Sequence, residues 1–555
     1  MQIVIPMSGF GERFRAKGYN KPKPLIEISG RSIISYVVDM FPGEDNFFFI
    51  CNEDHLSNVS YEMEAHLKSI CPSGTVIGIP SHKLGPIHAV NQVKDHLDMS
   101  QPVVVNYCDF TCYWDWQHFK CSVHNLDVDG AIPAYRGFHP HSLGSTNYAY
   151  IKEVNYRLQD IQEKQPYTDN RMQEFASSGT YYFKSADLMY QAFDWVVKNN
   201  VHVNHEYYVS VAYQYLLKNN LEMLVYPLQH FMQWGTPEDV AEYLEWSQVF
   251  RRMVTTDNQS LYKSKGSLIV PMAGLGKRFQ QEGYVQTKPL IEVSGRSMVT
   301  TAIQSCPKAQ QNMFVLRQDM AGVVEIQAEL EQNFNNSQFH ALKELTEGQA
   351  ITTLEGLKAL LLVNTTVDEP ITVAACDNAI LYDQEQWEQL SDNNDWDVLV
   401  WGGLNHANAK RRPEMFGWID HDLESLDIFN VSVKQPIDDS LSHPIVIGMF
   451  TFRKAEILKQ CIEALVANNH KINNEFYLDS AVNEALQLGF RCKVFNVDHF
   501  ISFGTPNDLK TFEYWQSCFS KWQAHPYELK LDLNIPEDKL PTLQSKYTRF
   551  DEQVF

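Results

Sequence analysis

Two short turns, at residues 7–14 and 272–279, have the composition of a site for an anionic ligand. Each follows a short apolar run and reads Gly-x-Gly-x-Arg, as MSGFGERF in the first case and MAGLGKRF in the second. Glycines let the main chain bend sharply and approach a ligand closely. A helix that begins after such a turn offers free N–H groups to a phosphate, and an arginine can add a charge-assisted bond. A lone Gly-x-Gly is more often a plain strand-to-helix turn. The candidate residues are Gly9, Gly11, Arg13, Gly274, Gly276 and Arg278.

A lysine follows each of these turns at the same distance. Lys23 and Lys288 each stand ten residues past the arginine and are each followed by Pro-Leu-Ile-Glu, which we expect to be an apolar strand. A lysine in such a place is usually a solvated surface charge. Next to a stiff proline and a phosphate-binding turn, it can also be a second fixed cation for the same ligand.

Further polar residues recur at nearly the same separation along the chain. The stretch KPLIEISGRS (23–32) returns as KPLIEVSGRS (288–297), and the offsets of the other pairs stay between 265 and 270 residues. A period this long indicates two copies of one domain rather than a solenoid. We expect a first domain over 1–255, a linker over 256–266, a second domain over 267–525 and a polar tail over 526–555. The other matched pairs are Asp109 with Asp377, Lys164 with Lys434, NHEYY (204–208) with NNEFY (473–477), and WGTPEDV (234–240) with FGTPNDL (503–509).

Each half alternates short apolar runs with longer amphipathic stretches. Runs such as QIVIP, NFFFI, TVIGI and PVVVN are rich in branched residues, as buried strands are. SIISYVVDM and PIHAVNQVKDHL have the pattern of helices. This alternation predicts an α/β fold with mainly parallel mixed sheets and with ligands at the carboxyl ends of the strands.

The composition excludes several classes of partner. The 555-residue chain has a net charge of -22 and shows no basic stripe, so we expect no nucleic-acid partner. It has no run of about 18 apolar residues and no N-terminal signal pattern, so we expect no membrane partner and a cytoplasmic location. None of the ten cysteines forms a C-x-x-C pair, which argues against zinc.

The ordered set of motifs resembles the sugar-1-phosphate nucleotidyltransferases, also called sugar-nucleotide pyrophosphorylases. Gly-x-Gly-x-Arg, Lys-Pro-Leu, a strand-end aspartate, a later Lys-x-Pro and Gly-Thr-Pro occur in that order in both halves, and the resemblance covers nearly the whole of each. IPMSGFGERF with KPKPLIEISG is especially similar to the branch that serves capsule and surface-polysaccharide synthesis. The resemblance implies tandem Rossmann-like nucleotidyltransferase domains related to GT-A glycosyltransferases. It also implies a Mg²⁺-dependent reaction of a nucleoside triphosphate with a sugar phosphate, or another phosphorylated acceptor, that releases pyrophosphate. CTP is favoured by analogy, with UTP, dTTP and GTP open.

The resemblance also implies roles for individual residues. The glycine turns with their arginines, and Lys23 and Lys288, would hold the triphosphate. LGPIHAV (84–90) and EGQAITT (347–353) would read the base, and Asp109 and Asp377 would hold Mg²⁺. Lys164 and Lys434 would grip the phosphate of the acceptor. The residues assigned to the base are Gly85, Gly348 and Gln349, and those assigned to the acceptor are Gly179, Glu206, Gly448 and Glu475.

Some positions depart from the family pattern. A second metal aspartate commonly stands two residues before the glycine of Gly-Thr-Pro, but Gln233 and Ser502 occupy these places. Glu163 before the first acceptor lysine is replaced by Val433, and Ser210 is matched by Asp479. Two alternatives stay open. One copy could have become a regulatory or scaffolding domain, or the protein could be a GT-A glycosyltransferase, although the Asp-x-Asp motif of that class is missing after the central strands.

Overall fold

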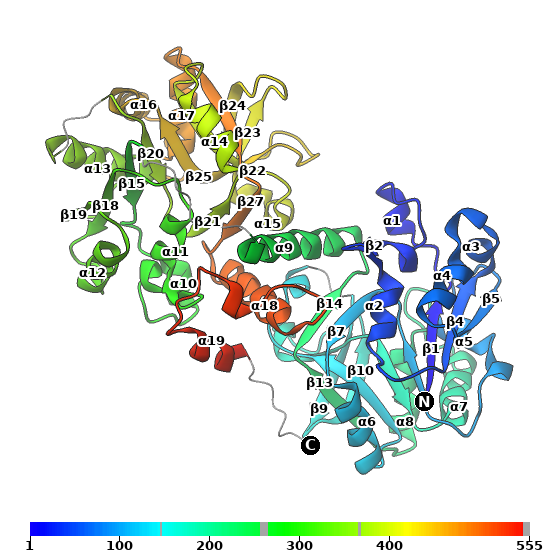
Figure 1. Cartoon of the computed structure of the whole chain (residues 1–555). Helices are drawn as coiled ribbons and strands as arrows, with labels where there is room; N and C mark the ends of the chain where they lie inside the picture. The colour runs from blue at the N-terminus through cyan, green and yellow to red at the C-terminus, as the bar shows by residue number, and fades with distance from the viewer. Residues whose placement is uncertain (145–146, 256–264, 364–367, 548–555) are drawn as a thin grey trace. The chain divides into compact units, whose positions relative to one another are not determined.

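The computed structural model describes residues 1–144, 147–255, 265–363 and 368–547 (Figure 1). The chain folds into two compact units. The first is formed by Met1–Ser247 with Lys521–Ala524, and the second by Gln248–Ser520 with the segment that begins at His525. Most of the predicted linker 256–266, and residues 548–555 of the predicted tail, lie outside the described residues. Within the described ranges, no helix has the length and apolar character needed to cross a membrane.

A mixed sheet forms the centre of the first unit (Figure 1). Its parallel part runs β6–β1–β4–β5, and β13 pairs in parallel with β8, while the remaining pairings are antiparallel. Strands β1 and β4 are almost entirely buried because both faces of the sheet are covered, which explains their continuous apolar sequences. The strands, in sheet order, are β11 (Phe175–Ser177), β9 (Ala149–Val154), β10 (Arg157–Glu163), β13 (Met223–Leu228), β8 (Gly130–Tyr135), β12 (Thr180–Phe183), β6 (Val103–Asn106), β1 (Gln2–Met7), β4 (Phe47–Asn52) and β5 (Thr75–Ile79).

Helices pack on this sheet through apolar side chains. Ile87, Met189 and Leu216, from three different helices, belong to the same buried cluster as Val4 and Val105 of the sheet. The helices that begin within the first unit are α1 (Glu12–Ala16), α2 (Ile33–Asp39), α3 (Glu53–Ser57), α4 (Met63–Ile70), α5 (Pro86–Asn91), α6 (Trp116–Asn125), α7 (Ala186–Lys198), α8 (Val209–Lys218) and α9 (Pro237–Thr255).

The second unit has its strands in a corresponding order. Strands β15, β18, β19 and β20 pair in parallel, and β25 joins them antiparallel to β20. The predicted α/β fold with mixed, parallel-containing sheets is thus confirmed. The strands, in sheet order, are β19 (Ser337–Leu342), β18 (Gln311–Arg317), β15 (Ser267–Pro271), β20 (Ile371–Ala374), β25 (Ile445–Phe452), β22 (Val398–Gly403) and β26 (Cys492–Asn496), with β23 (Gly417–His421) and β24 (Ile428–Val433) attached through β25.

Both faces of the second sheet are covered. Leu357 and Ile462 pack in one buried cluster with Phe450, whereas Val299 and Ile326 pack in another with residues of the same strands. The helices are α10 (Lys277–Gln281), α11 (Met298–Gln304), α12 (Val323–Asn333), α13 (Gln349–Val363), α14 (Gln384–Asp392), α15 (Ala407–Arg411), α16 (Ala455–Ala467), α17 (Leu478–Gln487), α18 (Pro506–Lys521) and α19 (Leu540–Tyr547).

Three local predictions were wrong. The Lys-Pro-Leu segments are 3₁₀ helices, η1 (Lys23–Leu25) and η6 (Lys288–Leu290), followed by strands of two residues. A proline in the first turn fixes φ and suits a short helical turn better than a strand. PIHAVNQVKDHL is not one helix, because α5 ends at Asn91 and the 3₁₀ helix η3 (Lys94–His96) follows. Asp109 and Asp377 do not end a strand but lie in the connections after β6 and β20.

The described part of the C-terminal segment is ordered against α18 in the second unit. Tyr527 is buried, and its hydroxyl accepts from Gln516 Nε2 and donates to Asp532, both at 2.8 Å. Tyr547 in α19 donates to the Gln516 Oε1 at 2.8 Å. A polar sequence therefore still contributes buried aromatic anchors here.

Candidate functional site

The glycine turn leaves the same open space in each unit. Gly11 and Gly276 directly precede α1 and α10 with φ of 65° and 63°, a conformation that favours glycine. Gly9 and Gly274 are exposed, and a Cβ built on either would have no heavy atom within 4 Å beyond its chain neighbours. The first glycine of each turn therefore borders space that a ligand can enter. Because α1 and α10 are only five residues long, their dipoles add little.

A lysine beside each turn is ion-paired with the aspartate that follows the neighbouring strand of the sheet. Lys23 Nζ donates to Asp109 Oδ2 at 2.8 Å, and Lys288 Nζ donates to Asp377 Oδ2. Burial alone would lower the pKa of both ammonium groups, but the aspartates outweigh it and hold the pKa above its ordinary value. The side chains of Lys23 and Asp109 keep 25% and 23% of their surface exposed, so a ligand can reach this pair.

Gln233 and Ser502, which depart from the motif pattern, each lie next to the aspartate of their unit. Strand β7 (Phe110–Tyr113) pairs with β14 (His230–Gln233), which brings Gln233 opposite Phe110. A Cβ on Gly235 would overlap Gln233 Nε2 and lie 3.1 Å from Asp109 Oδ2, so the amide and the carboxylate are neighbours. In the second unit a Cβ on Gly504 would lie 3.2 Å from Asp377 Oδ2 and 3.4 Å from Ser502 Oγ.

These donors fit Mg²⁺ only with help from a substrate. Within the described ranges, no group of three or more His, Cys, Asp or Glu side chains could hold a metal ion. In each unit the aspartate lies beside a neutral side chain, an amide in the first unit and a hydroxyl in the second, where Ser502 Oγ also donates to Asp508 Oδ2 at 3.2 Å. Mg²⁺ prefers oxygen ligands and usually binds through one or two carboxylates together with waters and substrate phosphates. The donor set is compatible with that mode.

A second lysine in each unit is held in an unusual main-chain conformation. Lys164 and Lys434 follow β10 and β24 with φ of 61° and 58°, and their N–H groups donate to the carbonyls of Tyr148 at 2.9 Å and Phe416 at 3.0 Å. A positive φ is uncommon for lysine and costs free energy, so its presence at both matched positions indicates a main chain that the surrounding structure constrains. The two lysines therefore leave their strands in the same main-chain conformation.

An aromatic ring lies under each of these ammonium groups. Lys164 Nζ donates to the Tyr208 hydroxyl at 2.6 Å and lies 4.5 Å from the centre of that ring. Tyr208 donates in turn to Glu206. In the second unit, Lys434 Nζ lies 5.0 Å from the Tyr477 ring. Cation–π contact of this kind holds the charge without neutralising it. We name these residues the Lys164 pocket (Lys164, Gly179, Glu206 and Tyr208) and, from the matched sequence positions, the Lys434 pocket (Lys434, Gly448, Glu475 and Tyr477).

The predicted base-reading glycines pack against these pockets. A Cβ on Gly85 would lie 2.7 Å from Tyr207 N, and one on Gly348 would lie 2.6 Å from Phe476 N. The main chains also bond there, with Tyr207 N donating to Leu84 O at 2.9 Å and Phe476 N to Glu347 O at 2.8 Å. Glycine is required here by the approach of another stretch of main chain. Gln349 is the first residue of α13.

The predicted residues of the first unit converge on one region. Arg13 lies within electrostatic range of both Lys23 and Tyr208, since after the larger effects of burial and of the nearby carboxylates its charge lowers the pKa of each group. Gly179 O accepts from Tyr107 N at 3.0 Å, two residues before Asp109. In the second unit, Arg278 acts on the pKa of Lys288 in the same way. The first site therefore gathers two lysines, an arginine and an aspartate near the open glycine turn, and the second unit has the same residue types at the matched positions.

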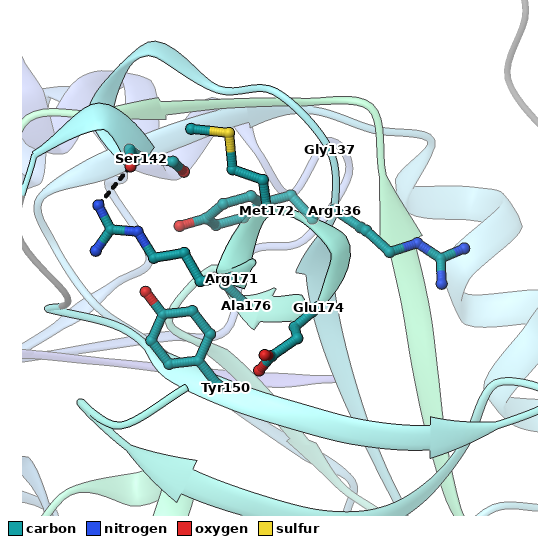
Figure 2. Close-up of a pocket in the computed structure, with 9 residues that line it drawn as sticks. Arg136, Gly137, Ser142, Tyr150, Arg171, Met172, Glu174 and Ala176 are labelled. Atoms are coloured by element: carbon teal, nitrogen blue, oxygen red, sulfur yellow. Dashed lines mark hydrogen bonds between the residues drawn. The ribbon is translucent and has the colours of Figure 1, made fainter. Parts of the chain in front are cut away.

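A separate hollow in the first unit does not contain these residues. It is lined by Arg171 and Arg136 among others, and Figure 2 shows Arg171 directed at Ser142. Arg171 donates to the main-chain carbonyls of Ser142 and Gly144, which uses its guanidinium for structure. We therefore assign no ligand to this hollow.

Two matched pairs of residues at the sites were not singled out by the sequence patterns. The rings of Tyr208 and Tyr477 lie in motifs where the neighbouring glutamate drew attention, and only the fold shows them under the lysines. Tyr107 and its match Ala375 precede the aspartates by two residues, and they differ too much to be noticed as a repeat.

Comparison with known proteins yields fold relatives only. No family model matches the chain, and no curated protein matches it. A nucleoside-diphosphate-sugar pyrophosphorylase from Vibrio cholerae RC9 is 20% identical over 44% of this chain and 98% of its own, with a TM-score of 0.38. The inositol-1-phosphate CTP transferase from T. maritima is 11% identical over 45% and 95%, with a TM-score of 0.36. A UTP-bound UGPase from Acinetobacter baumannii is 13% identical over 48% and 97%, with a TM-score of 0.36. At such identities and TM-scores, these likenesses carry no argument. The activity proposed below rests on the geometry of the sites.

Proposed function

We propose that the protein is a tandem nucleotidyltransferase. Each unit would join a nucleoside triphosphate to a sugar phosphate, or a similar phosphorylated acceptor, and release pyrophosphate. One observation carries the proposal. Two lysines, one arginine and one aspartate surround an open glycine turn, and the same set recurs at the matched positions of the second unit. Such a layout suits two phosphate-bearing ligands that must be held together against their own repulsion.

The chemistry needs alignment and charge neutralisation rather than a base. An oxygen of the acceptor phosphate, already ionised, forms a bond to the α-phosphorus while the bond from that phosphorus to the bridging oxygen breaks. The electron pair leaves with pyrophosphate, and no proton has to move. Arg13 and Lys23 would bind the triphosphate and Lys164 the acceptor phosphate, with Arg278, Lys288 and Lys434 in the second unit. Mg²⁺, when bound at Asp109 or Asp377, would supply further neutralisation of phosphate charge.

The biological use of the activated product is inferred from the resemblance of IPMSGFGERF and KPKPLIEISG to the surface-polysaccharide branch of the nucleotidyltransferases. We propose an activated precursor for capsule or another surface polysaccharide, with CTP as the first nucleotide to try and UTP, dTTP and GTP as alternatives. Two copies of one domain in tandem are part of this proposal.

A matrix of nucleotides and acceptors tests the activity. The full chain is incubated with Mg²⁺, each of the four nucleoside triphosphates and a panel of phosphorylated acceptors, and pyrophosphate release is measured. The same matrix is run on Lys23→Ala, Lys288→Ala and the double variant. Lys184→Ala and Lys454→Ala serve as matched controls, since both remove an exposed ion pair away from the sites.

The outcomes separate the interpretations. We expect release in the wild type and in both controls, a partial loss in each single variant and no release from the double variant. Full activity of one single variant with every nucleotide and acceptor pair would show that the altered unit is not catalytic. No release from the wild type with any pair would overturn the proposal.

A further inference from the structure

The wall beside the predicted acceptor glycine differs between the two pockets. Gly179 is buried, and a Cβ on it would lie 3.0 Å from the Tyr107 ring and 3.1 Å from the Phe110 ring. Gly448 is partly exposed, and within the described part of the chain the one heavy atom that such a Cβ would meet within 4 Å is the Ala375 Cβ at 3.3 Å. Two aromatic rings therefore close the Lys164 pocket at a point where the Lys434 pocket is open.

The difference is one of residue type at matched positions. Tyr107 corresponds to Ala375 and Phe110 to Asn378, each at the offset of 268 that relates Asp109 to Asp377. Tyr107 is also tied at its far end, because its hydroxyl accepts from Val209 N at 3.3 Å, beside Tyr208. Its ring thus spans from Gly179 to the start of α8, and an alanine at 375 cannot do the same.

The carboxylate near the lysine comes from opposite walls of the two pockets. In the first unit Glu163, the last residue of β10, accepts from Ser210 Oγ of α8 at 2.6 Å. In the second unit Val433 ends β24, and the carboxylate is Asp479 in the first turn of α17. Glu163 directly precedes Lys164 in the chain, and the Asp479 carboxylate lies against Gly417, the strand partner of Val433, which directly precedes Lys434.

The strand partner of the residue before each lysine also differs between the two units. Ala149 is the strand neighbour of Glu163, and Gly417 is the strand neighbour of Val433. A Cβ on Gly417 would overlap Asp479 Oδ2, at a separation that side chains do not reach without moving. Glycine at 417 is therefore what makes room for the Asp479 carboxylate.

The floor of each pocket, a buried aromatic residue of the central sheet, also differs between the units: it is a tyrosine in the first and a phenylalanine in the second. Tyr181 of β12 is buried, and burial together with the nearby Glu163 carboxylate raises the pKa of its phenol. The matched residue of β25 is Phe450, since Tyr181 pairs with Val105 and Phe450 with Val373 at equivalent register positions. The hydroxyl that borders Glu163 has no counterpart on the Phe450 ring. These substitutions form one coordinated change, which is the expected result of selection for a different fit.

We propose that the two units take different phosphorylated acceptors, a compact hydroxylated one at Glu163 in the first unit and a bulkier one at Asp479 in the second. The inference rests on the proposed function, because it names what each of its two sites would select. Glu163 would accept a hydrogen bond from an acceptor hydroxyl on the strand side of the pocket, and Asp479 from one on the helix side. The bulk of the second acceptor would extend past Gly448 toward Ala375.

Two acceptors that differ in one substituent test this selectivity. Glucose 1-phosphate and N-acetylglucosamine 1-phosphate are compared in the full chain, with Lys288→Ala leaving the first site active and Lys23→Ala leaving the second. The kcat/KM for the N-acetylated acceptor is divided by that for glucose 1-phosphate. We expect this ratio to be at least about tenfold higher for the second site, the size of discrimination that a pocket achieves by steric fit.

Reciprocal wall variants supply the matched control. In the second site, Ala375→Tyr should lower the ratio, and in the first site Tyr107→Ala should raise it. Equal ratios in the two sites, or ratios that neither variant moves, would overturn the inference.

A binding measurement separates this inference from the proposed function. The same two acceptors are titrated calorimetrically without nucleotide against Lys434→Ala, which keeps the acceptor lysine of the first site, and against Lys164→Ala, which keeps that of the second. Absence of pyrophosphate release together with different acceptor affinities at the two sites would refute the proposed activity and keep the selectivity. Equal affinities would refute the selectivity whatever the activity.

Discussion

The two units agree where a triphosphate would bind and differ where an acceptor would bind. The Gly11–Lys23–Asp109 arrangement returns in Gly276, Lys288 and Asp377 with the same contacts. Around Lys164 and Lys434, by contrast, the wall, the carboxylate and the floor all change. The comparison teaches that a charge layout can be kept while the fit around it is rebuilt, since charges act at a distance and steric fit depends on each contact.

The largest effect is expected from removing the aspartate of one unit. Asp109→Asn should lower the turnover of the first site about 100- to 1,000-fold, because it removes both the partner of Lys23 and the carboxylate proposed for Mg²⁺. Asp377→Asn should do the same to the second site alone. Pyrophosphate release measured in the Lys288→Ala and Lys23→Ala backgrounds checks this. Equal losses at both sites from one substitution would break the comparison between independent sites.

A smaller effect is expected at the second lysine. Lys164→Ala should raise the KM for the acceptor about 10- to 100-fold with little change in the KM for nucleotide, because a charge-assisted bond contributes about 1.5–3 kcal/mol. Lys164→Arg keeps the charge and is the matched control, and Lys434→Ala is the counterpart in the other unit. A rise in the nucleotide KM instead would place Lys164 on the triphosphate.

These predictions depend differently on the sequence and the structure. The repeat at offsets of 265–270 singled out Gly9, Lys23, Asp109 and Lys164 without a structure, because each recurs as the same residue type in the second half. The α/β alternation was also readable, since buried strands require continuous apolar runs.

The contacts between residues far apart in the chain, and the 3₁₀ helices, could not be predicted from the spacing of residues in the sequence. Val433 and Asp479 are separated by 46 residues and were two unrelated substitutions in the sequence, but the fold brings them to one pocket. The role of Gly417 depends on a contact between β23 and α17 that no local pattern encodes. The Pro-Leu-Ile-Glu run after each lysine was predicted as a strand because it is apolar, whereas its proline lies in the first turn of a 3₁₀ helix that begins at the lysine.

The coupling of Gly417 to Asp479 is open to a stability test. Gly417→Ala should destabilise the second unit by about 1–3 kcal/mol, because the added methyl overlaps the carboxylate. Gly417→Ala/Asp479→Ser should recover most of that loss. Thermal unfolding of both variants, with Ala149→Gly as the comparison in the first unit, measures the effect. A double variant as unstable as the single one would show that Asp479 is not the source of the conflict.

The smallest effect concerns the protonation of the Glu163 carboxyl. Burial raises its pKa to about 7, against the opposing effects of the Ser210 hydrogen bond and the Lys164 charge. The folded state therefore binds this proton more tightly than the unfolded state. The contribution of the group to stability is present below its unfolded pKa of 4.5 and is lost as the pH rises toward about 7.

Replacing the Glu163 carboxyl by an amide removes the contribution of this group to the pH dependence of stability. Relative to the wild type, Glu163→Gln should gain about 1–2 kcal/mol of stability between pH 5 and pH 8. Asp479→Asn should gain in a lower window, because burial raises the pKa of Asp479 to about 6. Melting temperatures from about pH 4 to pH 8, which cover the windows of both groups, provide the measurement. A difference between Glu163→Gln and wild type that stays constant with pH would contradict the assignment of a buried, tightly protonated carboxyl.

The most direct test of the central claim identifies the products of the reaction. The wild-type chain is incubated with Mg²⁺, each nucleoside triphosphate and the acceptor panel, and phosphorus NMR follows every phosphate. The nucleotidyltransferase account predicts one pyrophosphate and one new diphosphate-linked product for each triphosphate consumed, and none from the Lys23→Ala/Lys288→Ala variant. Formation of nucleoside diphosphate and free phosphate, or unchanged spectra with every combination, would contradict it.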